Sequence, residues 1–237
     1  MDVRAVFFDA GETLVHPDPS FAELFTRVLR DAGHPVDPAE VTEVVSVYSK
    51  RFSDAVRAEE QPRLWSVSRE ASRAFWLDIY RGFVADMGIE DQGGLAETLY
   101  QAFSDPSNYG LHADAIPTLE RLAATDLILG VISNFEEWLE HLLEGVGVSR
   151  FFPVRVISGA VGFEKPDRRI FDLALERAGV AAEETVYVGD HPHFDVEASR
   201  NAGMFPVLID RRGRYPQVDA VRITSLEDLP AAIGLDA

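Results

Sequence analysis

The stretch "TVYVGDHPHFDVEASRNAG", residues 185–203, decides the fold class. Its first residues form a short apolar run rich in β-branched and aromatic side chains, which predicts a buried strand ending at Gly189-Asp190. A second carboxylate follows at Asp195, and helical spacing then continues to Gly203, a residue type that often ends a helix. A strand followed directly by a helix is the repeating unit of α/β proteins.

The same alternation of strand and helix extends through much of the chain. Further strands are predicted at residues 3–8, 127–133, 154–158 and 205–210. Helices are predicted between them, at residues 115–124, 136–146 and 168–179. Since strand and helix alternate from residue 112 onward, we expect an α/β fold with a parallel sheet covered by helices on both faces.

Residues 17–107 show a different pattern, with helical periodicity and no convincing strand. The first helix of this segment opens with a capping box formed by Ser20 and Glu23. The proline-rich stretch "HPDPS" (16–20) bounds the segment on one side, and "SDPSNYG" (104–110) bounds it on the other. We therefore predict an all-helical domain at residues 17–107, inserted into a core made of residues 1–16 and 108–237.

Composition and charge exclude several classes of function. The 237 residues are 46% hydrophobic and 26% charged, which is ordinary for a folded globular protein. A formal net charge of -18 disfavours nucleic-acid and membrane partners. The chain has no cysteine, and no stretch approaches the length of a membrane span. We expect a soluble, cytoplasmic protein; its oligomeric state cannot be read from the sequence.

Polar side chains follow the expected strands, where open parallel sheets bind their ligands. Asp9 follows the first strand; taken alone, an aspartate in this position is more often a turn former or helix cap than a functional residue. Ser133 and Asn134 follow the strand at 127–133, just before a helix. A helix start can bind a phosphate or carboxylate, although Ser and Asn are also common N-caps.

Lys165 stands out because only two of the 22 basic residues are lysines. A lysine in an arginine-rich chain, placed just before a proline, suggests a need for a compact ammonium group. A solvated surface lysine is the alternative reading.

Asp190 and Asp195 are candidate metal ligands. Hard cations such as Mg²⁺ prefer carboxylate and carbonyl oxygens, and aspartates at strand ends supply them. His191 and His193 lie between the two aspartates, but Pro192 interrupts any helical spacing. We expect these histidines to be loop residues and not metal ligands.

Together these motifs resemble the haloacid dehalogenase (HAD) superfamily, whose members are mostly phosphate-transferring hydrolases with a Rossmann-like core. The motifs follow the family's order: the aspartate of "FFDAGETLV" (7–15), "ISN" (132–134), the lysine of "EKP" (164–166) and "GDHPHFD" (189–195). The helical segment resembles the cap domain of the dehalogenase-like subgroup. The resemblance implies a Mg²⁺-dependent phosphatase acting on a small phosphorylated metabolite.

The resemblance also implies roles for individual residues. Asp9 would attack the substrate as a covalent nucleophile and form an aspartyl-phosphate. Ser133, the Asn134 amide and Lys165 would bind the transferring phosphoryl group, and Thr13 belongs to the same substrate-binding set.

The implied magnesium site is formed by Asp9, Asp190 and the backbone carbonyl of Gly11, with Asp195 supporting it through water or a hydrogen bond. A carboxylate nucleophile that faces an anion needs a cation to reduce their repulsion, and Mg²⁺ together with Lys165 would provide it.

Gly11 departs from the family's pattern, because phosphatases of the family carry there an aspartate that protonates the leaving alcohol. Three readings follow. The protein hydrolyses esters whose leaving groups need little help, or a substitute acid such as Glu12 or a cap residue acts. It instead cleaves carbon–halogen bonds, as do family members without this aspartate. Or it is a binding or regulatory module that has lost turnover.

Glu12 is the first candidate for a substitute acid. One position further along the chain, its side chain should leave the backbone in another direction. We favour a Glu12 that points toward the cap and makes a salt bridge or hinge contact.

Overall fold

The computed structural model describes residues 2–58, 64–91 and 94–235, and the chain forms two compact units. The core unit comprises Met1–Val15, Ser66–Ser68 and Leu111–Ala237. The helical unit comprises His16–Trp65 and Arg69–Gly110. Within the described ranges, no helix is both long enough and apolar enough to cross a bilayer.

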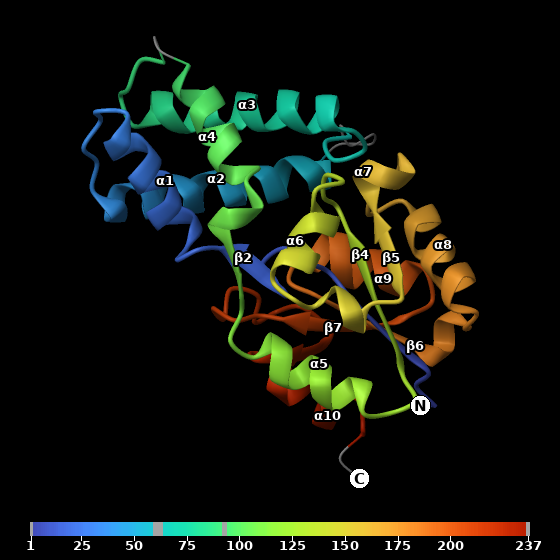
Figure 1. The fold of residues 1–237 in the computed structure, drawn as a ribbon. Coiled ribbons are helices and arrows are strands. Elements are labelled where there is room, and N and C mark those ends of the chain that lie inside the picture. The colour runs from blue at the N-terminus through green and yellow to red at the C-terminus, as the bar shows by residue number, and fades with distance from the viewer. Residues whose placement is uncertain (1, 59–63, 92–93, 236–237) are drawn as a thin grey trace. The chain divides into compact units, whose positions relative to one another are not determined.

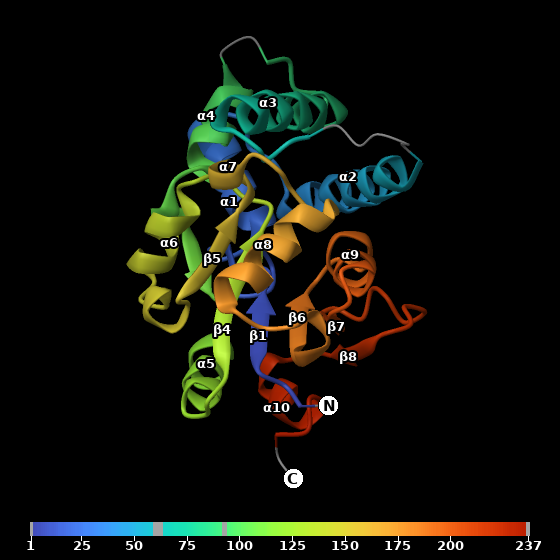
Figure 2. The same cartoon turned by 90° about the vertical axis from the view of Figure 1, so that its right-hand side faces the viewer.

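The core unit is built on a six-stranded parallel sheet (Figure 1), whose strand order β5-β4-β1-β6-β7-β8 can be followed in Figure 2. The strands are β1 (Ala5–Phe8), β4 (Ile128–Ser133), β5 (Val154–Ile157), β6 (Thr185–Gly189), β7 (Phe205–Ile209) and β8 (Val221–Ile223). All four residues of β1 and all five of β6 are buried, as expected for strands covered on both faces. The predicted α/β fold class is confirmed.

Helices cover both faces of this sheet. Figure 1 shows α8 on one side of the sheet and α5 and α6 on the other, and Figure 2 gives the view turned by 90°. The α-helices of the core unit are α5 (Ala115–Ala123), α6 (Leu139–Gly145), α7 (Ser158–Val161), α8 (Arg168–Ala178), α9 (Ala198–Asn201) and α10 (Leu229–Ala232). Short 3₁₀ turns lie at η2 (Ser149–Phe151), η3 (Ala182–Glu184) and η5 (Leu226–Asp228).

One predicted helix differs in form. The segment after β6 begins with a π-helical turn, η4 (Pro192–Glu197), and becomes α-helical only at α9. Such wide turns are rare and occur mostly near functional sites. Here the turn contains Asp195, whose side chain is buried.

The strand register brings the candidate site residues to one edge of the sheet. Phe8 at the end of β1 pairs with Val131 of β4 and with Val188 of β6. Because the strands are parallel, the residues that follow these three strands emerge together, at the edge where such sheets bind ligands.

The helical unit contains α1 (Phe21–Asp31), α2 (Pro38–Ala58), α3 (Arg69–Asp86), α4 (Leu95–Phe103) and the 3₁₀ turn η1 (Pro106–Asn108). The Ser20 side chain accepts a hydrogen bond from the backbone N–H of Glu23, which confirms the predicted start of α1. Aromatic rings fill the interior: Phe25 contacts Phe83 edge-on, with ring centroids 5.6 Å apart. Such ring pairs stabilise a core beyond their buried area.

Two short strands, β2 (Val15–Pro17) and β3 (Tyr109–Leu111), form a separate two-stranded sheet where the chain passes from one unit to the other. The segment Ser66–Ser68, between α2 and α3 in the chain, belongs to the core unit. Both the N–H and the hydroxyl of Ser66 donate hydrogen bonds to Glu164, at 2.6 and 2.5 Å.

Candidate active site

Asp9 lies directly after β1 and is 7% exposed. Its Oδ1 accepts hydrogen bonds from the Ser133 hydroxyl (2.9 Å) and from Lys165 Nζ (2.8 Å). In the described part of the chain, Oδ2 of Asp9 has no hydrogen-bond partner. One carboxylate oxygen is therefore held by the protein while the other is left for chemistry.

Lys165 is buried among acceptors. Its Nζ donates to Asp9 Oδ1, to Asp195 Oδ1 (2.7 Å) and to the Tyr187 hydroxyl (2.9 Å). Burial by itself would lower the pKa of Lys165, but the charges of Asp195 and Asp9 outweigh it and raise this pKa well above the ordinary value. The ammonium group is therefore charged at neutral pH, and each of its three hydrogens has a partner.

Asn134 holds the backbone that presents this lysine. Its side-chain amide donates to the carbonyl of Lys165 (2.8 Å), and its Oδ1 accepts from the Lys165 N–H (2.7 Å). This double hydrogen bond ties the loop after β4 to the segment that carries the lysine. Ser133, Asn134 and Lys165, predicted as one set, lie together around Asp9.

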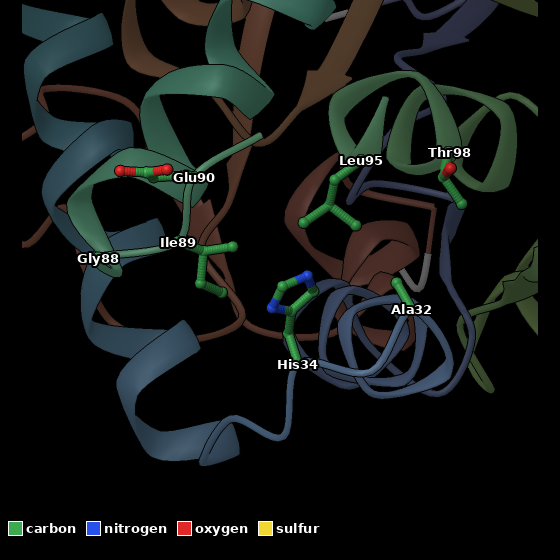
Figure 3. A pocket seen from close by; sticks show the side chains of 7 residues that line it. All are labelled: Ala32, His34, Gly88, Ile89, Glu90, Leu95 and Thr98. Atoms are coloured by element: carbon green, nitrogen blue, oxygen red, sulfur yellow. The ribbon is translucent and has the colours of Figure 1, made fainter. Parts of the chain in front are cut away.

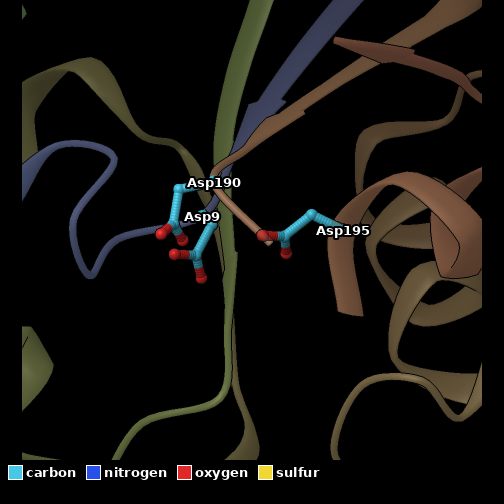
Figure 4. Close-up of side chains that lie close together, drawn as sticks. All are labelled: Asp9, Asp190 and Asp195. Atoms are coloured by element: carbon cyan, nitrogen blue, oxygen red, sulfur yellow. The ribbon is translucent and has the colours of Figure 1, made fainter. Parts of the chain in front are cut away.

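Asp190 and Asp195 approach Asp9 from the segment after β6. Single oxygen atoms of the three carboxylates lie within 4.8 Å of one another. Figure 4 shows the three side chains gathered at one place. Asp195 is held on both oxygens, with Oδ1 on Lys165 and Oδ2 accepting the N–H of His191 (2.8 Å). For Asp190, Arg214 Nη2 lies 3.7 Å from Oδ2.

The electrostatics of these carboxylates favour a bound cation. Burial, followed by the charges of Asp195 and Asp9, raises the pKa of Asp190 well above the ordinary value. Burial also raises the pKa of Asp9, against the opposing effect of Lys165. A divalent cation would offset this excess of negative charge, and carboxylate oxygens are the donors that Mg²⁺ prefers. The residues present therefore fit a magnesium ion.

The loop after Asp9 has free space at Gly11, the position where the resemblance implies an acidic side chain in family phosphatases. A Cβ atom added at Gly11 would come within 4 Å of a single non-neighbouring atom of the described residues, Cε2 of Phe135 at 4.0 Å. Glu12 adopts the left-handed backbone region (φ 56°), which a non-glycine residue enters at a cost. Its Oε2 lies 3.4 Å from Arg212 Nη2, so the expected salt bridge is made with a core residue and not with the cap.

Thr13 is completely buried, and its hydroxyl has no hydrogen-bond partner among the described residues. Its backbone carbonyl accepts a hydrogen bond from Arg211 Nη2 (2.9 Å). The visible contribution of Thr13 is therefore to fix the loop that carries Asp9 against the loop after β7. Contact of Thr13 with substrate stays a prediction.

Two residues of the site were missed by the sequence patterns. The Tyr187 hydroxyl donates to the carbonyl of Ile132 (2.8 Å) and accepts from Lys165, although Tyr187 reads in sequence as an ordinary strand residue. Arg214 belongs to a loop with no motif of its own. The available signal for Tyr187 was a hydroxyl inside an otherwise apolar strand, because a buried tyrosine hydroxyl needs a hydrogen-bond partner.

The side chains of His191 and His193 make hydrogen bonds within the turn that follows β6. The Nδ1 atom of His191 accepts hydrogen bonds from the N–H groups of His193 (3.2 Å) and Phe194 (3.3 Å). His193 Nδ1 lies 2.8 Å from Glu197 Oε2. His191 precedes η4 as its N-cap, in agreement with the predicted loop position, whereas His193 lies inside the π-helical turn and not in a loop.

A cavity of about 460 Å³ lies in the helical unit and is separate from these carboxylates (Figure 3). Its lining comes from the ends of α1 and α3 and the start of α4: Ala32, His34, Gly88, Ile89, Glu90, Leu95 and Thr98. None of the predicted catalytic residues borders it.

Comparisons with known proteins support one family. The haloacid dehalogenase-like hydrolase family matches residues 3–203. The chain is 32% identical, over 98% of its length and 96% of the relative's, to haloacid dehalogenase-like hydrolase domain-containing protein 3 of Danio rerio. It is 30% identical to the glyceraldehyde 3-phosphate phosphatase of Methanopyrus kandleri, over 92% of this chain and 88% of that protein.

A solved structure agrees in fold. The HAD hydrolase YfnB of Bacillus subtilis superposes with a TM-score of 0.80 at 17% identity, covering 99% of this chain and 100% of that one. The family match spans the strands that carry Asp9, Ser133 and Asp190, so the motifs, the fold and the comparisons agree. The chain therefore belongs to the haloacid dehalogenase-like hydrolase family and is a HAD-family hydrolase.

Proposed function

We propose that this hydrolase is a Mg²⁺-dependent phosphatase that acts on a small phosphorylated substrate through an aspartyl-phosphate at Asp9. One observation carries the proposal: a single oxygen of Asp9 is held by Ser133 and Lys165, while Asp190 and Asp195 lie close by. A nucleophile, anion-binding donors and a cation site are thus gathered at one sheet edge. Relatives such as the glyceraldehyde 3-phosphate phosphatase support the reaction type.

In the proposed reaction, Oδ2 of Asp9 attacks phosphorus and the bond from phosphorus to the leaving oxygen breaks. Lys165 and the Ser133 hydroxyl, which donate to Asp9 Oδ1 in this structure, would each redirect one hydrogen bond to a phosphoryl oxygen of the bound substrate. Water then hydrolyses the aspartyl-phosphate and releases inorganic phosphate. Positioning and charge stabilisation provide most of the catalysis in reactions of this kind.

A magnesium ion at this site would be held by Asp9, Asp190 and the Gly11 carbonyl, with Asp195 supporting it. When bound, it would reduce the repulsion between the carboxylate nucleophile and the anionic substrate. Asp195 is already committed on both oxygens to Lys165 and His191, which favours a supporting role over direct ligation.

Calorimetric titration of Mg²⁺ tests the metal site. Asp190→Asn should abolish binding, because it removes the carboxylate that is least engaged by the protein, and Asp195→Asn should weaken it. Asp172→Asn, an exposed change on α8, is the matched control and should bind Mg²⁺ as the wild type does. Unchanged affinity in Asp190→Asn would overturn the assignment.

A screen of phosphorylated metabolites with and without Mg²⁺ tests the reaction. Turnover that depends on Mg²⁺ supports the proposal. Turnover of a 2-haloacid that survives EDTA would point instead to carbon–halogen cleavage, which needs no metal in the family. Binding of phosphorylated ligands without turnover of any substrate would point to a regulatory module.

A further inference from the structure

Two features of the core unit meet beside the nucleophile: the open space at Gly11 and the ring of Phe135. The family resemblance implies that a side chain at the position of Gly11 faces the leaving group, so the space beside Gly11 belongs to the leaving-group side of the site. A Cβ atom added at Gly11 would have Cε2 of Phe135 as its neighbour, at 4.0 Å. A leaving group placed there meets an aromatic ring instead of an acid.

The Phe135 backbone is fixed by contacts on both sides of its peptide. Its N–H donates to the Ser158 hydroxyl (2.9 Å), and its carbonyl accepts from the N–H of Gly159 (3.0 Å). A Cβ atom at Gly159 would lie 3.0 Å from that carbonyl oxygen, so the close approach of the two segments depends on glycine. Phe135 also directly follows Asn134, which holds Lys165, and its position is thereby linked to the anion-binding groups.

The ring of Phe135 is held in place by a neighbouring ring and is partly exposed. Phe135 is half-buried, and its ring packs edge to face with that of Trp138, with centroids 4.7 Å apart at 73°. Ordered aromatic side chains bind other rings in offset or edge-to-face geometry, with a gain beyond simple burial. The Phe135 edge next to Gly11 is suited to such a contact.

Leaving-group chemistry points the same way. Without a positioned acid, the departing oxygen leaves with its electron pair as an anion, which is easy for a phenol-type oxygen and hard for an alkyl alcohol. We propose that the substrate is a phosphate monoester of an aromatic hydroxyl, and that Phe135 determines this specificity by contacting the aromatic leaving group. The inference rests on the proposed phosphatase function.

The bond changes balance without a further reactant besides water. A bond forms between Asp9 Oδ2 and phosphorus, and the bond from phosphorus to the aryl oxygen breaks. The aryloxide leaves with the electron pair and takes its proton from water, which leaves hydroxide. Hydrolysis of the aspartyl-phosphate consumes one water and releases hydrogen phosphate and a proton, and this proton neutralises the hydroxide.

A pair of substrates matched in leaving-group acidity separates ring recognition from chemistry. Phenyl phosphate is compared with hexafluoroisopropyl phosphate, whose alcohol is about as acidic as a phenol but has no ring. The wild type should prefer phenyl phosphate by roughly two- to tenfold in kcat/KM, mostly through KM, because ring contact is already made in the bound substrate. Equal kcat/KM values for the two esters would overturn the proposal.

Variants of Phe135 test whether its ring causes the preference for phenyl phosphate. Phe135→Leu keeps apolar volume and should lose the preference for phenyl phosphate, while Phe135→Tyr retains the ring and should keep it. Phe151→Leu is the matched control. Phe151 precedes β5 and so lies at the amino end of a strand, whereas the site lies at the carboxyl ends. This variant should hydrolyse both substrates as the wild type does. Retention of the full preference in Phe135→Leu would contradict the assignment.

Binding measurements keep this inference distinct from the proposed function. Calorimetry of both esters with Asp9→Asn, in which the nucleophile is removed, should show tighter binding of phenyl phosphate, and this difference should vanish in the double variant with Phe135→Leu. If the wild type hydrolyses neither ester, the phosphatase proposal fails, and the binding preference still decides the role of Phe135.

Discussion

At the scale of single residues, Gly11 determines how the reaction can proceed. The position two residues after the nucleophile has no side chain, and the space around it admits one, with Phe135 the near neighbour at 4.0 Å from an added Cβ. Glu12 is a poor substitute acid, since it pairs with Arg212 on the core surface. The site therefore suits leaving groups that depart without a proton.

Gly11→Asp should create the missing acid. Turnover of an alkyl phosphate should rise by up to ~10² to 10⁴, the range typical of a positioned general acid, while hydrolysis of aryl phosphates changes little. Glu12→Gln is the matched control and should leave both rates close to the wild type. The measurement is kcat/KM across esters of graded leaving-group acidity. Near inactivity of Glu12→Gln on alkyl esters, with no gain in Gly11→Asp, would show instead that Glu12 is the acid.

Much of the site follows from sequence because its residues end predicted strands. Asp9, Ser133 and Asp190 each follow an apolar run, and parallel strands bring such ends together. The partners of Lys165 could not be predicted in this way. The hydrogen bond from Lys165 to Tyr187 depends on how the segment before α8 packs against β6, and the ion pair of Arg214 depends on an irregular loop.

At the scale of secondary-structure elements, Asp114 joins three parts of the core unit. It immediately precedes α5 and accepts hydrogen bonds from Arg211 in the loop after β7, at 2.7 and 3.0 Å. It also accepts from the Ser225 hydroxyl (2.8 Å) and the Leu226 N–H (2.9 Å) at the start of η5. Burial alone would raise the pKa of Asp114, but these hydrogen bonds, led by Arg211, lower it to about 2 from 3.8.

Asp114→Asn should lower the free energy of unfolding by about 2 kcal/mol at pH 7. Because the folded-state pKa is depressed, this contribution is present above about pH 4 and is lost as the pH falls toward 2. Urea unfolding at several pH values should show the difference from wild type shrinking below pH 4. The exposed change Asp172→Asn should cost about 0.5 kcal/mol or less. A difference for Asp114→Asn that is independent of pH would contradict this account.

Strands with a continuous buried run were predictable, whereas elements that depend on distant partners were not. The edge strand β8 has three residues, one of them the exposed Arg222, and carries no clear pattern. Likewise, Ser66–Ser68 lies inside the predicted helical domain but belongs to the core unit, because Ser66 bonds to Glu164, 98 residues away. Local periodicity contains no information about such contacts.

At the scale of the whole molecule, charge sets the main constraint on function. The net charge of -18 repels an anionic substrate over long distances, although salt screens this effect. Local cations must therefore attract the phosphoryl group. Lys165 already has three acceptors, two of them carboxylates, so a divalent metal ion is the cation that would make the pocket attractive to phosphate.

Rapid quenching tests most directly whether a phosphoryl group is transferred to Asp9 in the presence of Mg²⁺. Wild-type protein is mixed with Mg²⁺ and phenyl phosphate labelled at phosphorus, quenched in acid within milliseconds and digested. We expect transient label on the peptide that contains Asp9, and none in Asp9→Asn or with EDTA. Hydrolysis at the full rate with no protein-bound label at any time, or with label on another residue, would contradict the account.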